Sequence, residues 1–200
     1  ITIFGGLNQS TINSEVELPE IDNFVIDGYE RVFNSGFNFG LEKKIGPTLV
    51  GLGLNQRGSQ TNFNTWNESF KTRNEGFNRW TLNYLTLHGL YSFDLKDNIT
   101  GFCGIQLGQF NGGEWRVETE ITHLGVKETS KFLEPIIDEK YKKFDYGIVF
   151  GAQYWLTEKI GLRSSYYMGL ADIKGSASSS YQGLTNTGNR KNVTTSFSLI

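Results

Sequence analysis

The sequence predicts an all-β fold, an eight-stranded antiparallel up-and-down transmembrane β-barrel with short periplasmic turns and long extracellular loops. Three observations predict it. Apolar side chains alternate with glycines and polar side chains along eight segments, and the connections between these segments alternate between short and long. In addition, 24 of the 200 residues are glycine, well above the average of about 7%. A chain of this length suits one barrel, so residues 1–200 are expected to form a single domain.

The alternation predicts strands at residues 1–10, 31–44, 48–60, 79–93, 99–111, 143–156, 160–170 and 191–200. Successive side chains of a strand point to opposite faces, so every second residue shares a face. In chain order, the apolar faces carry Ile3 and Leu7; Phe33, Phe37, Phe39 and Leu41; Val50, Leu52 and Leu54; Leu85, Leu87, Tyr91 and Phe93; Cys103, Ile105 and Leu107; Ile148, Phe150, Ala152 and Tyr154; Leu162, Tyr166, Met168 and Leu170; Phe197 and Leu199.

The opposite faces of the same strands are polar and partly charged. They carry Asn34, Asn38, Glu42, Asn55, Arg57, Thr86, His88, Gln106, Asp145, Gln153, Arg163, Ser165, Thr194 and Ser196, with glycines between them. A soluble barrel would be apolar inside and polar outside. A polar face inside a narrow barrel therefore predicts that the apolar faces contact lipid. The alternative is a half-buried antiparallel sheet of a soluble protein.

The composition is compatible with a membrane barrel although it resembles that of a soluble protein. The net charge is −2, the mean hydropathy is −0.35 and no apolar run approaches the length of a membrane helix. A barrel hides its hydrophobicity in alternate residues, so window averages cancel it. No leader is visible at Ile1, which fits either a cytosolic protein or a mature chain whose signal peptide has been removed, and the strand pattern favours the second. The absence of a basic patch argues against nucleic acid as a partner.

The connections indicate which end of the barrel faces which compartment. Three are tight, at residues 45–47, 94–98 and 157–159, and four are long and polar, at about 11–30, 61–78, 112–142 and 171–190. Bacterial outer-membrane barrels have short periplasmic turns and long external loops, and an even number of strands. Closure of such a barrel satisfies every backbone group in lipid. Both chain termini would then lie on the periplasmic side.

Two segments carry a family resemblance. The segments "DYGIVFGAQYWLTEKIGLRSSYYMGLADI" and "GFNFGLEKKIGPTLVGLGLNQRGSQ" resemble the small outer-membrane β-barrel family typical of Bacteroidota, also called PorT-like or outer membrane protein beta-barrel. The matching residues are Asp145 with Gly147, then Arg163, then Tyr166 or Tyr167 ahead of the Gly169-Leu170 pair. The likeness extends from about residue 33 to 173. It implies a location in the outer membrane of a Gram-negative bacterium and a role beside secretion or barrel-assembly machinery.

Four charged residues on the polar face are expected to pair across the lumen. Counted from the short turns, Glu42 and Arg163 lie near the periplasmic end, while Arg57 and Asp145 lie about ten residues higher. An unpaired charge at these positions would cost several kcal/mol, so we expect two buried ion pairs, Glu42 with Arg163 and Arg57 with Asp145. These pairs would plug the barrel. A narrow pore is the alternative.

The sequence does not point to catalysis, a metal or a cofactor. His88 and His123 are the only histidines, and neither has ligands at zinc spacing. Some small outer-membrane barrels hydrolyse lipid with a Ser-His pair on the wall, but His88 is followed by Gly89-Leu90 and is expected to point inward. We therefore expect no enzymatic activity. The open alternatives are an outer-membrane lipid hydrolase, a narrow pore and a soluble lipocalin-like carrier.

Aromatic residues near the ends of the strands suggest membrane-interface belts. Tyr91, Phe93, Tyr154 and Trp155 lie near the short turns, and Trp80 is a candidate for the upper belt. The second long loop has further aromatic residues around it, which form either a docking surface or packing within the loop: Trp66, Phe70 and Phe77.

The third long loop carries two further expectations. A short helix with Pro135 in its first turn would cap the mouth of the barrel. Lys140, Lys142 and Lys143 would contact lipopolysaccharide phosphates.

The expected function follows from these features. A barrel with a plugged interior acts through its surfaces, as an envelope-structural or accessory subunit of a complex that binds protein partners through its loops or rim.

Overall fold

The computed structural model describes residues 1–13, 24–136, 143–173 and 190–200. Nine antiparallel β-strands occupy these ranges: β1 (Thr2–Asn13), β2 (Phe24–Ile45), β3 (Thr48–Asn67), β4 (Thr72–Lys96), β5 (Ile99–His123), β6 (Val126–Ile136), β7 (Phe144–Trp155), β8 (Gly161–Gly169) and β9 (Lys191–Leu199). Among the described residues, no helix is long and apolar enough to cross a lipid bilayer. The regular elements in the part that the structure describes are all β-strands.

Eight of the strands close into a ring. The hydrogen-bonded order is β4-β3-β2-β1-β9-β8-β7-β5-β6, and an additional β4–β5 pairing closes the barrel. Strand β5 has two partners on its other edge: residues 99–109 pair with β7 and residues 113–123 pair with β6. Gly112, with φ of +83°, lies where β5 changes partner, and only glycine adopts this backbone region readily. Strand β6 thus lies outside the closed ring.

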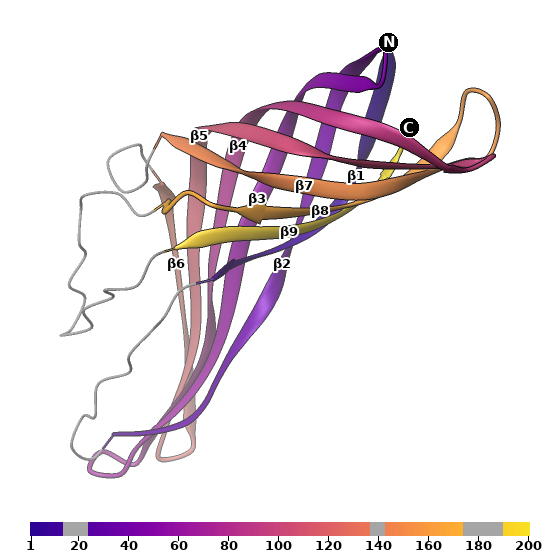
Figure 1. The fold of residues 1–200 in the computed structure, drawn as a ribbon. Helices are drawn as coiled ribbons and strands as arrows, with labels where there is room; N and C mark the ends of the chain where they lie inside the picture. The colour runs from indigo at the N-terminus through magenta and orange to yellow at the C-terminus, as the bar shows by residue number, and fades with distance from the viewer. Residues whose placement is uncertain (14–23, 137–142, 174–189) are drawn as a thin grey trace.

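Three tight connections lie at one end of the barrel, which we call the turn end. Their flanking residues pair directly, as Ile45 with Thr48, Lys96 with Ile99, and Trp155 with Gly161. Figure 1 shows that both chain termini also lie toward this end. The observed ring agrees with the expected antiparallel up-and-down arrangement of eight strands.

At the far end the wall is much taller on one side. Figure 1 shows β2 to β6 continuing past the ends of β1, β7, β8 and β9 as a curved sheet. We call this part the upper sheet; it comprises residues 24–33, 59–67, 72–82, 113–123 and 126–136. Its hairpins end at Asn67 paired with Thr72 and at His123 paired with Val126.

The upper sheet corrects two sequence expectations. Most of residues 61–78 and 112–136 form strands rather than loops, because cross-strand hydrogen bonds continue beyond the apolar part of the wall. The expected helix at Pro135 is wrong, because Pro135 lies in β6 opposite Glu114. Within the described sheet β6 is an edge strand, where a residue without an N–H group is tolerated.

The outer surface of the ring is apolar, as expected. Leu7, Phe39, Leu52, Ile105 and Phe197 are each 52–72% exposed although they are large and hydrophobic. The other residues expected on this face are exposed too, except Ala152 and Tyr166, which are half-buried. A soluble barrel or sheet would bury such side chains, so the soluble lipocalin-like carrier is wrong. The hydrocarbon of a bilayer is the surrounding that suits this surface.

Candidate functional site

Near the turn end, three buried charged or polar side chains meet inside the barrel. Arg163 Nη2 on β8 donates a hydrogen bond to Glu42 Oε1 on β2. His88 Nε2 on β4 lies 3.4 Å from the other carboxylate oxygen, Glu42 Oε2. Gly51 separates Glu42 from His88 at this level, and a Cβ atom at Gly51 would lie only 2.4 Å from His88 Nε2. A residue without a side chain at position 51 therefore lets the imidazole reach Glu42.

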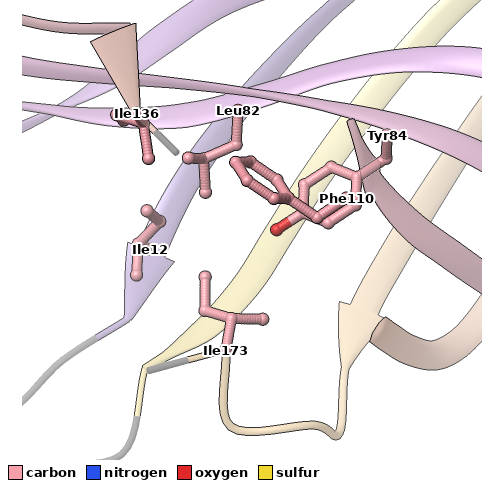
Figure 2. Close-up of a cluster of buried hydrophobic side chains, with 6 residues drawn as sticks. All are labelled: Ile12, Leu82, Tyr84, Phe110, Ile136 and Ile173. Atoms are coloured by element: carbon pink, nitrogen blue, oxygen red, sulfur yellow. The ribbon is translucent and has the colours of Figure 1, made fainter. Parts of the chain in front are cut away.

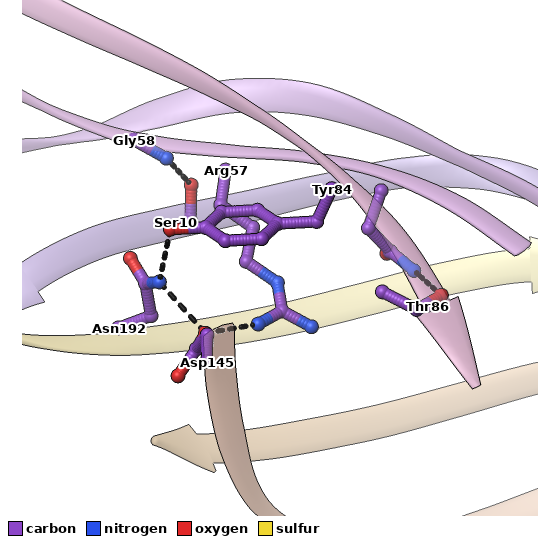
Figure 3. A network of polar contacts seen from close by, with 8 residues as sticks. Ser10, Arg57, Gly58, Tyr84, Thr86, Asp145 and Asn192 are labelled. Atoms are coloured by element: carbon purple, nitrogen blue, oxygen red, sulfur yellow. Dashed lines mark hydrogen bonds and ion pairs between the residues drawn. The ribbon is translucent and has the colours of Figure 1, made fainter. Parts of the chain in front are cut away.

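About half-way along the ring, a second ion pair crosses the lumen. Arg57 Nη1 on β3 donates to Asp145 Oδ2 on β7 at 2.7 Å, and the two side chains are 2% and 0% exposed. Asn192 Nδ2 on β9 donates to the same oxygen at 2.8 Å. The Arg57 guanidinium also lies 3.8 Å from the centre of the Tyr167 ring. Figure 3 shows Arg57, Asp145 and Asn192 converging from three strands.

An apolar layer lies in the lumen above the second ion pair. Figure 2 shows six buried side chains facing one another, contributed by β1, β4, β5, β6 and the segment after β8. They are Ile12, Leu82, Tyr84, Phe110, Ile136 and Ile173. We call this layer the apolar cap. Leu82 and Ile173 are 0% exposed, so water does not reach the middle of the cap.

A small cavity lies inside the ring between the two ion pairs. Its volume is about 50 Å³, and Arg57 and Arg163 both line it. One buried water molecule needs roughly 10–15 Å³ by this measure, so the cavity has room for only a few. Buried side chains thus lie at three levels of the lumen: the Glu42–Arg163 pair, the Arg57–Asp145 pair and the apolar cap.

Comparison with protein families identifies this barrel. A family model described as "Outer membrane protein beta-barrel domain" matches residues 1–175. The chain belongs to this family. Membership places the protein in the outer membrane of a Gram-negative bacterium. No curated protein matches the sequence at a significant level.

Solved structures of similar fold share little sequence with this outer-membrane barrel. Neisserial surface protein A is 11% identical, with 98% of this chain and 93% of that chain covered and a TM-score of 0.47. The attachment invasion locus protein Ail of Yersinia pestis is 13% identical, with 99% and 94% covered and a TM-score of 0.44. The outer membrane protein OprG from Pseudomonas aeruginosa is 10% identical, with 98% and 90% covered and a TM-score of 0.42.

The structure brings together all four charged residues that the sequence analysis singled out, in the expected pairs. It adds three groups that sequence reasoning missed, namely Asn192, Tyr167 and the apolar cap. Tyr167 and Asn192 lie on inward faces beside residues already assigned there, so the alternation contained a signal for both. Ile173 lies after β8, and nothing in its local sequence indicates that it enters the cap.

Three of the five expected belt residues lie on the outer surface near the turn end. Tyr91, Phe93 and Tyr154 are 55%, 42% and 46% exposed. Trp155 follows Tyr154 directly and pairs with the buried Gly161, so it lies on the inward face and is half-buried. The expectation for Trp155 is therefore wrong, because it overlooked the alternation of faces.

The expectation that Trp80 belongs to an outer aromatic belt is also wrong, because Trp80 lies on the inner face. Trp80 and Trp115 pack against the apolar cap, with their ring centres 5.9 Å apart. Both indole N–H groups donate to Asn78 Oδ1, at 2.7 and 2.6 Å. Phe132 on β6 adds a third ring, 5.3 Å from Trp115. The inner face of the upper sheet thus carries an aromatic cluster just above the cap.

The outer face of the upper sheet is charged instead. Lys127 Nζ donates to Glu120 Oε1 at 2.5 Å, which raises the pKa of Lys127. Arg116 Nε donates to Glu118 Oε1 at 2.9 Å, and this hydrogen bond lowers the pKa of Glu118. These pairs are exposed, so each contributes little to stability.

The remaining candidate residues are placed as follows. Lys143 is exposed beside the first residue of β7, while Lys140 and Lys142 lie outside the described residues. His123 Nδ1 lies 3.1 Å from the Thr72 hydroxyl at the hairpin tips. No group of three or more metal-binding side chains occurs in the part of the chain that the structure describes.

Proposed function

We propose that this protein is a closed, non-enzymatic outer-membrane barrel that holds the upper sheet outside the membrane, where the sheet binds a protein partner of the cell envelope. The observation that carries the proposal is the set of buried side chains inside the ring. Two buried ion pairs, a cavity of about 50 Å³ and the apolar cap lie within the wall, and this packing supports a lumen that passes no solute. A barrel of this kind can act only through its surfaces.

Conductance in planar lipid bilayers tests the closed state. The refolded wild-type barrel is expected to give no current steps. The double variant R57S/D145S shortens both side chains of the second ion pair and enlarges the lumen at that level, and it serves as the matched comparison. Discrete current steps from the wild type would refute the closed barrel and favour the narrow pore.

The upper sheet is the surface that we propose for the partner. Along β3, β4 and β5 its inner face carries no Asp, Glu, Lys or Arg. Trp80 and Trp115 form the aromatic cluster there together with Phe132 on β6, whose inner face also carries Glu128 and Glu134. Aromatic residues are enriched at the centres of protein interfaces, whereas charged residues are depleted there. The resemblance to PorT-like barrels of Bacteroidota supports a partner in secretion or barrel-assembly machinery.

Affinity purification from native membranes in mild detergent tests the partner. The wild-type barrel is compared with a variant in which residues 116–133 are replaced by a two-residue turn, which removes most of the β5–β6 hairpin but leaves Trp115 paired with Glu134. A partner that copurifies with both proteins equally would place binding elsewhere on the barrel.

The proposal requires the turn end to face the periplasm. Its support is the contrast between three tight turns at one end and tall hairpins at the other. In a C103A background, a cysteine replacing Glu68 at the β3–β4 tip should react with a membrane-impermeant maleimide on intact cells. A cysteine replacing Asp97 at a tight turn should not react. The opposite pattern would reverse the orientation.

We further propose that Lys143, with Lys140 and Lys142, contacts lipopolysaccharide phosphates. The support is its position: Lys143 is exposed and directly precedes Phe144 and Tyr146, which are 64% and 51% exposed on the apolar surface. A lysine at such a boundary lies near the level of lipid head groups. A triple Lys-to-Gln variant should lose the thermal stabilisation that added lipopolysaccharide gives the wild type. An unchanged gain would refute the contact.

The lipid-hydrolase alternative receives no support from the position of His88. Its imidazole lies inside the lumen, 3.4 Å from Glu42 and with its ring centre 5.8 Å from that of Phe4. A hydrolase needs a serine within hydrogen-bond reach of its histidine on the lipid-facing wall. The buried position of His88 supports a structural role.

A further inference from the structure

A groove hollows the outer surface of the ring near the turn end. Its volume is about 470 Å³, and residues of β5, β7, β8 and β9 line it. Three of them, Gln153, Arg163 and Ser198, have side chains buried on the lumen side, so they contribute backbone to the groove. The groove therefore reaches the strands themselves at a place where outward side chains do not cover the wall.

Two small residues on neighbouring strands create the hollow. Ala152 on β7 pairs with Ser164 on β8, and Ser164 pairs in turn with Phe197 on β9, so the three share one row across the outer surface. Gly101 on β5 extends this row beside Ala152, but the ring of Phe93 covers it, 2.5 Å from where a Cβ atom would lie. The row is thus low at Ala152 and Ser164 and has a phenyl ring at each end.

Bulky side chains border this row on both sides. Tyr154 and Leu162 pair with each other toward the turn end, and Phe150 and Tyr166 pair on the other side, with their ring centres 5.1 Å apart. The two borders are four residues apart along each strand, which is about 13 Å. Carbon atoms in contact are about 3.5–4.0 Å apart, so a single hydrocarbon chain fits in the trough between the borders.

Ser164 gives the groove a polar group on a surface that faces hydrocarbon. Its side chain is exposed, and its hydroxyl makes no hydrogen bond within the part of the chain that the structure describes. A hydroxyl without a partner in an apolar surrounding is costly. The ester carbonyl of a membrane lipid is an acceptor at the right depth, because Ser164 lies only three residues from Gly161, where β8 begins at the turn end.

We propose that this groove binds one acyl chain of a phospholipid from the periplasmic leaflet, whose ester carbonyl accepts a hydrogen bond from Ser164. The groove continues the apolar surface described above, and the protein lies in an outer membrane, so lipid is what covers it. Within a membrane the gain comes from close packing and hydrogen bonding rather than from removal of water. The choice of phospholipid rests on the proposed orientation, because that orientation places the turn end in the periplasmic leaflet.

The two tight turns beside the groove suit a head group that carries both charges. They lie side by side, because the Trp155 N–H group donates to the Asn98 carbonyl at 2.9 Å. Each turn has an exposed lysine next to an exposed acidic residue, at residues 96–97 and 158–159. A phosphate and an ammonium group would each find an opposite charge there. Phosphatidylethanolamine is therefore the probe for this site.

Native mass spectrometry of the refolded barrel in mild detergent tests the proposal. With phosphatidylethanolamine added, the wild type is expected to retain one lipid per barrel in a saturable manner. The variant A152L/S164L fills the groove and should retain none. The matched control is C103L, which enlarges an exposed side chain of β5 outside the groove and should bind like the wild type. Equal retention by the wild type and A152L/S164L would overturn the proposal.

The variant S164A keeps the groove open but removes the hydroxyl donor. It should weaken binding of the diester lipid by about 2–10-fold, as expected for the loss of one hydrogen bond. Binding of the diether analogue, which has no carbonyl in either chain, should be the same in S164A and the wild type. If S164A binds the diester lipid as tightly as the wild type does, the proposed contact is wrong.

Competition with lipopolysaccharide separates this inference from the proposed orientation. Phosphatidylethanolamine should stay bound when an equal concentration of lipopolysaccharide is added, and its displacement would overturn the proposal. The cysteine-labelling experiment described above reports the orientation without reference to any lipid. A failure of the orientation and a failure of the lipid site can therefore be distinguished.

Discussion

Replacing Asp145 by asparagine should strongly destabilise the barrel. Asp145 Oδ2 accepts hydrogen bonds from Arg57 at 2.7 Å and from Asn192 at 2.8 Å, and both members of the ion pair are almost fully buried. The substitution keeps the shape of the side chain but leaves the guanidinium charge of Arg57 uncompensated. Loss of one partner of a buried ion pair costs about 3–5 kcal/mol. We expect a loss of this size in urea unfolding from lipid vesicles, followed by tryptophan fluorescence.

Two comparisons separate the buried pair from general effects of charge. The variant E120Q breaks the exposed pair with Lys127 and should change the free energy of unfolding by less than about 1 kcal/mol. The double variant R57M/D145L replaces the buried pair by apolar side chains and should recover most of the stability that D145N loses, because no charge is then left unpaired. A loss below about 1 kcal/mol in D145N, or no recovery in R57M/D145L, would refute the reasoning.

Two further substitutions test the packing of the lumen. G51A should destabilise the barrel by about 1–3 kcal/mol in the same assay, because the new Cβ atom would meet His88 Nε2 at 2.4 Å, whereas G89A meets nothing within 4 Å and should be nearly neutral. L82A in the apolar cap should cost about 2–5 kcal/mol, since Leu82 is 0% exposed, while L85A, 48% exposed on the outer surface, should have a smaller effect. Equal losses within either pair would contradict the packing described above.

The alternation of side chains predicts the ring well because successive residues of a strand face lipid and the polar lumen in turn. Side-chain polarity therefore repeats every two residues. A shift of one residue would put every polar side chain of a strand into hydrocarbon. The heights of Glu42 and Arg57 could be counted from the turn at Gly46, so both of their ion-pair partners could be predicted. Trp80 could have been assigned correctly too, because it shares the parity of Thr86 and His88.

The upper sheet could not be predicted in the same way. Along residues 59–67 and 72–79 both faces of the strands are mostly polar, and the outer face of β4 also carries Arg73, Glu75 and Arg79, so no apolar face marks the continuing hydrogen-bond ladder. Strand β6 begins with "VKETSK", which has the composition of a loop. Pro135 fits the first turn of a helix, but an edge strand accepts proline equally well. The apolar cap depends on side chains from distant elements, which no local pattern connects.

The narrow lumen sets an order for the assembly of the barrel. The closed lumen proposed above would not pass a polypeptide hairpin, so in that proposal the polar tips at Asn67–Thr72 and His123–Val126 cross the membrane before the ring is complete. Strands β1 and β9 pair with each other along residues 5–13 and 191–199, which is the longest sequence separation among the described strand pairings. Pairing between distant segments has the highest entropic cost, so we expect this seam to close last.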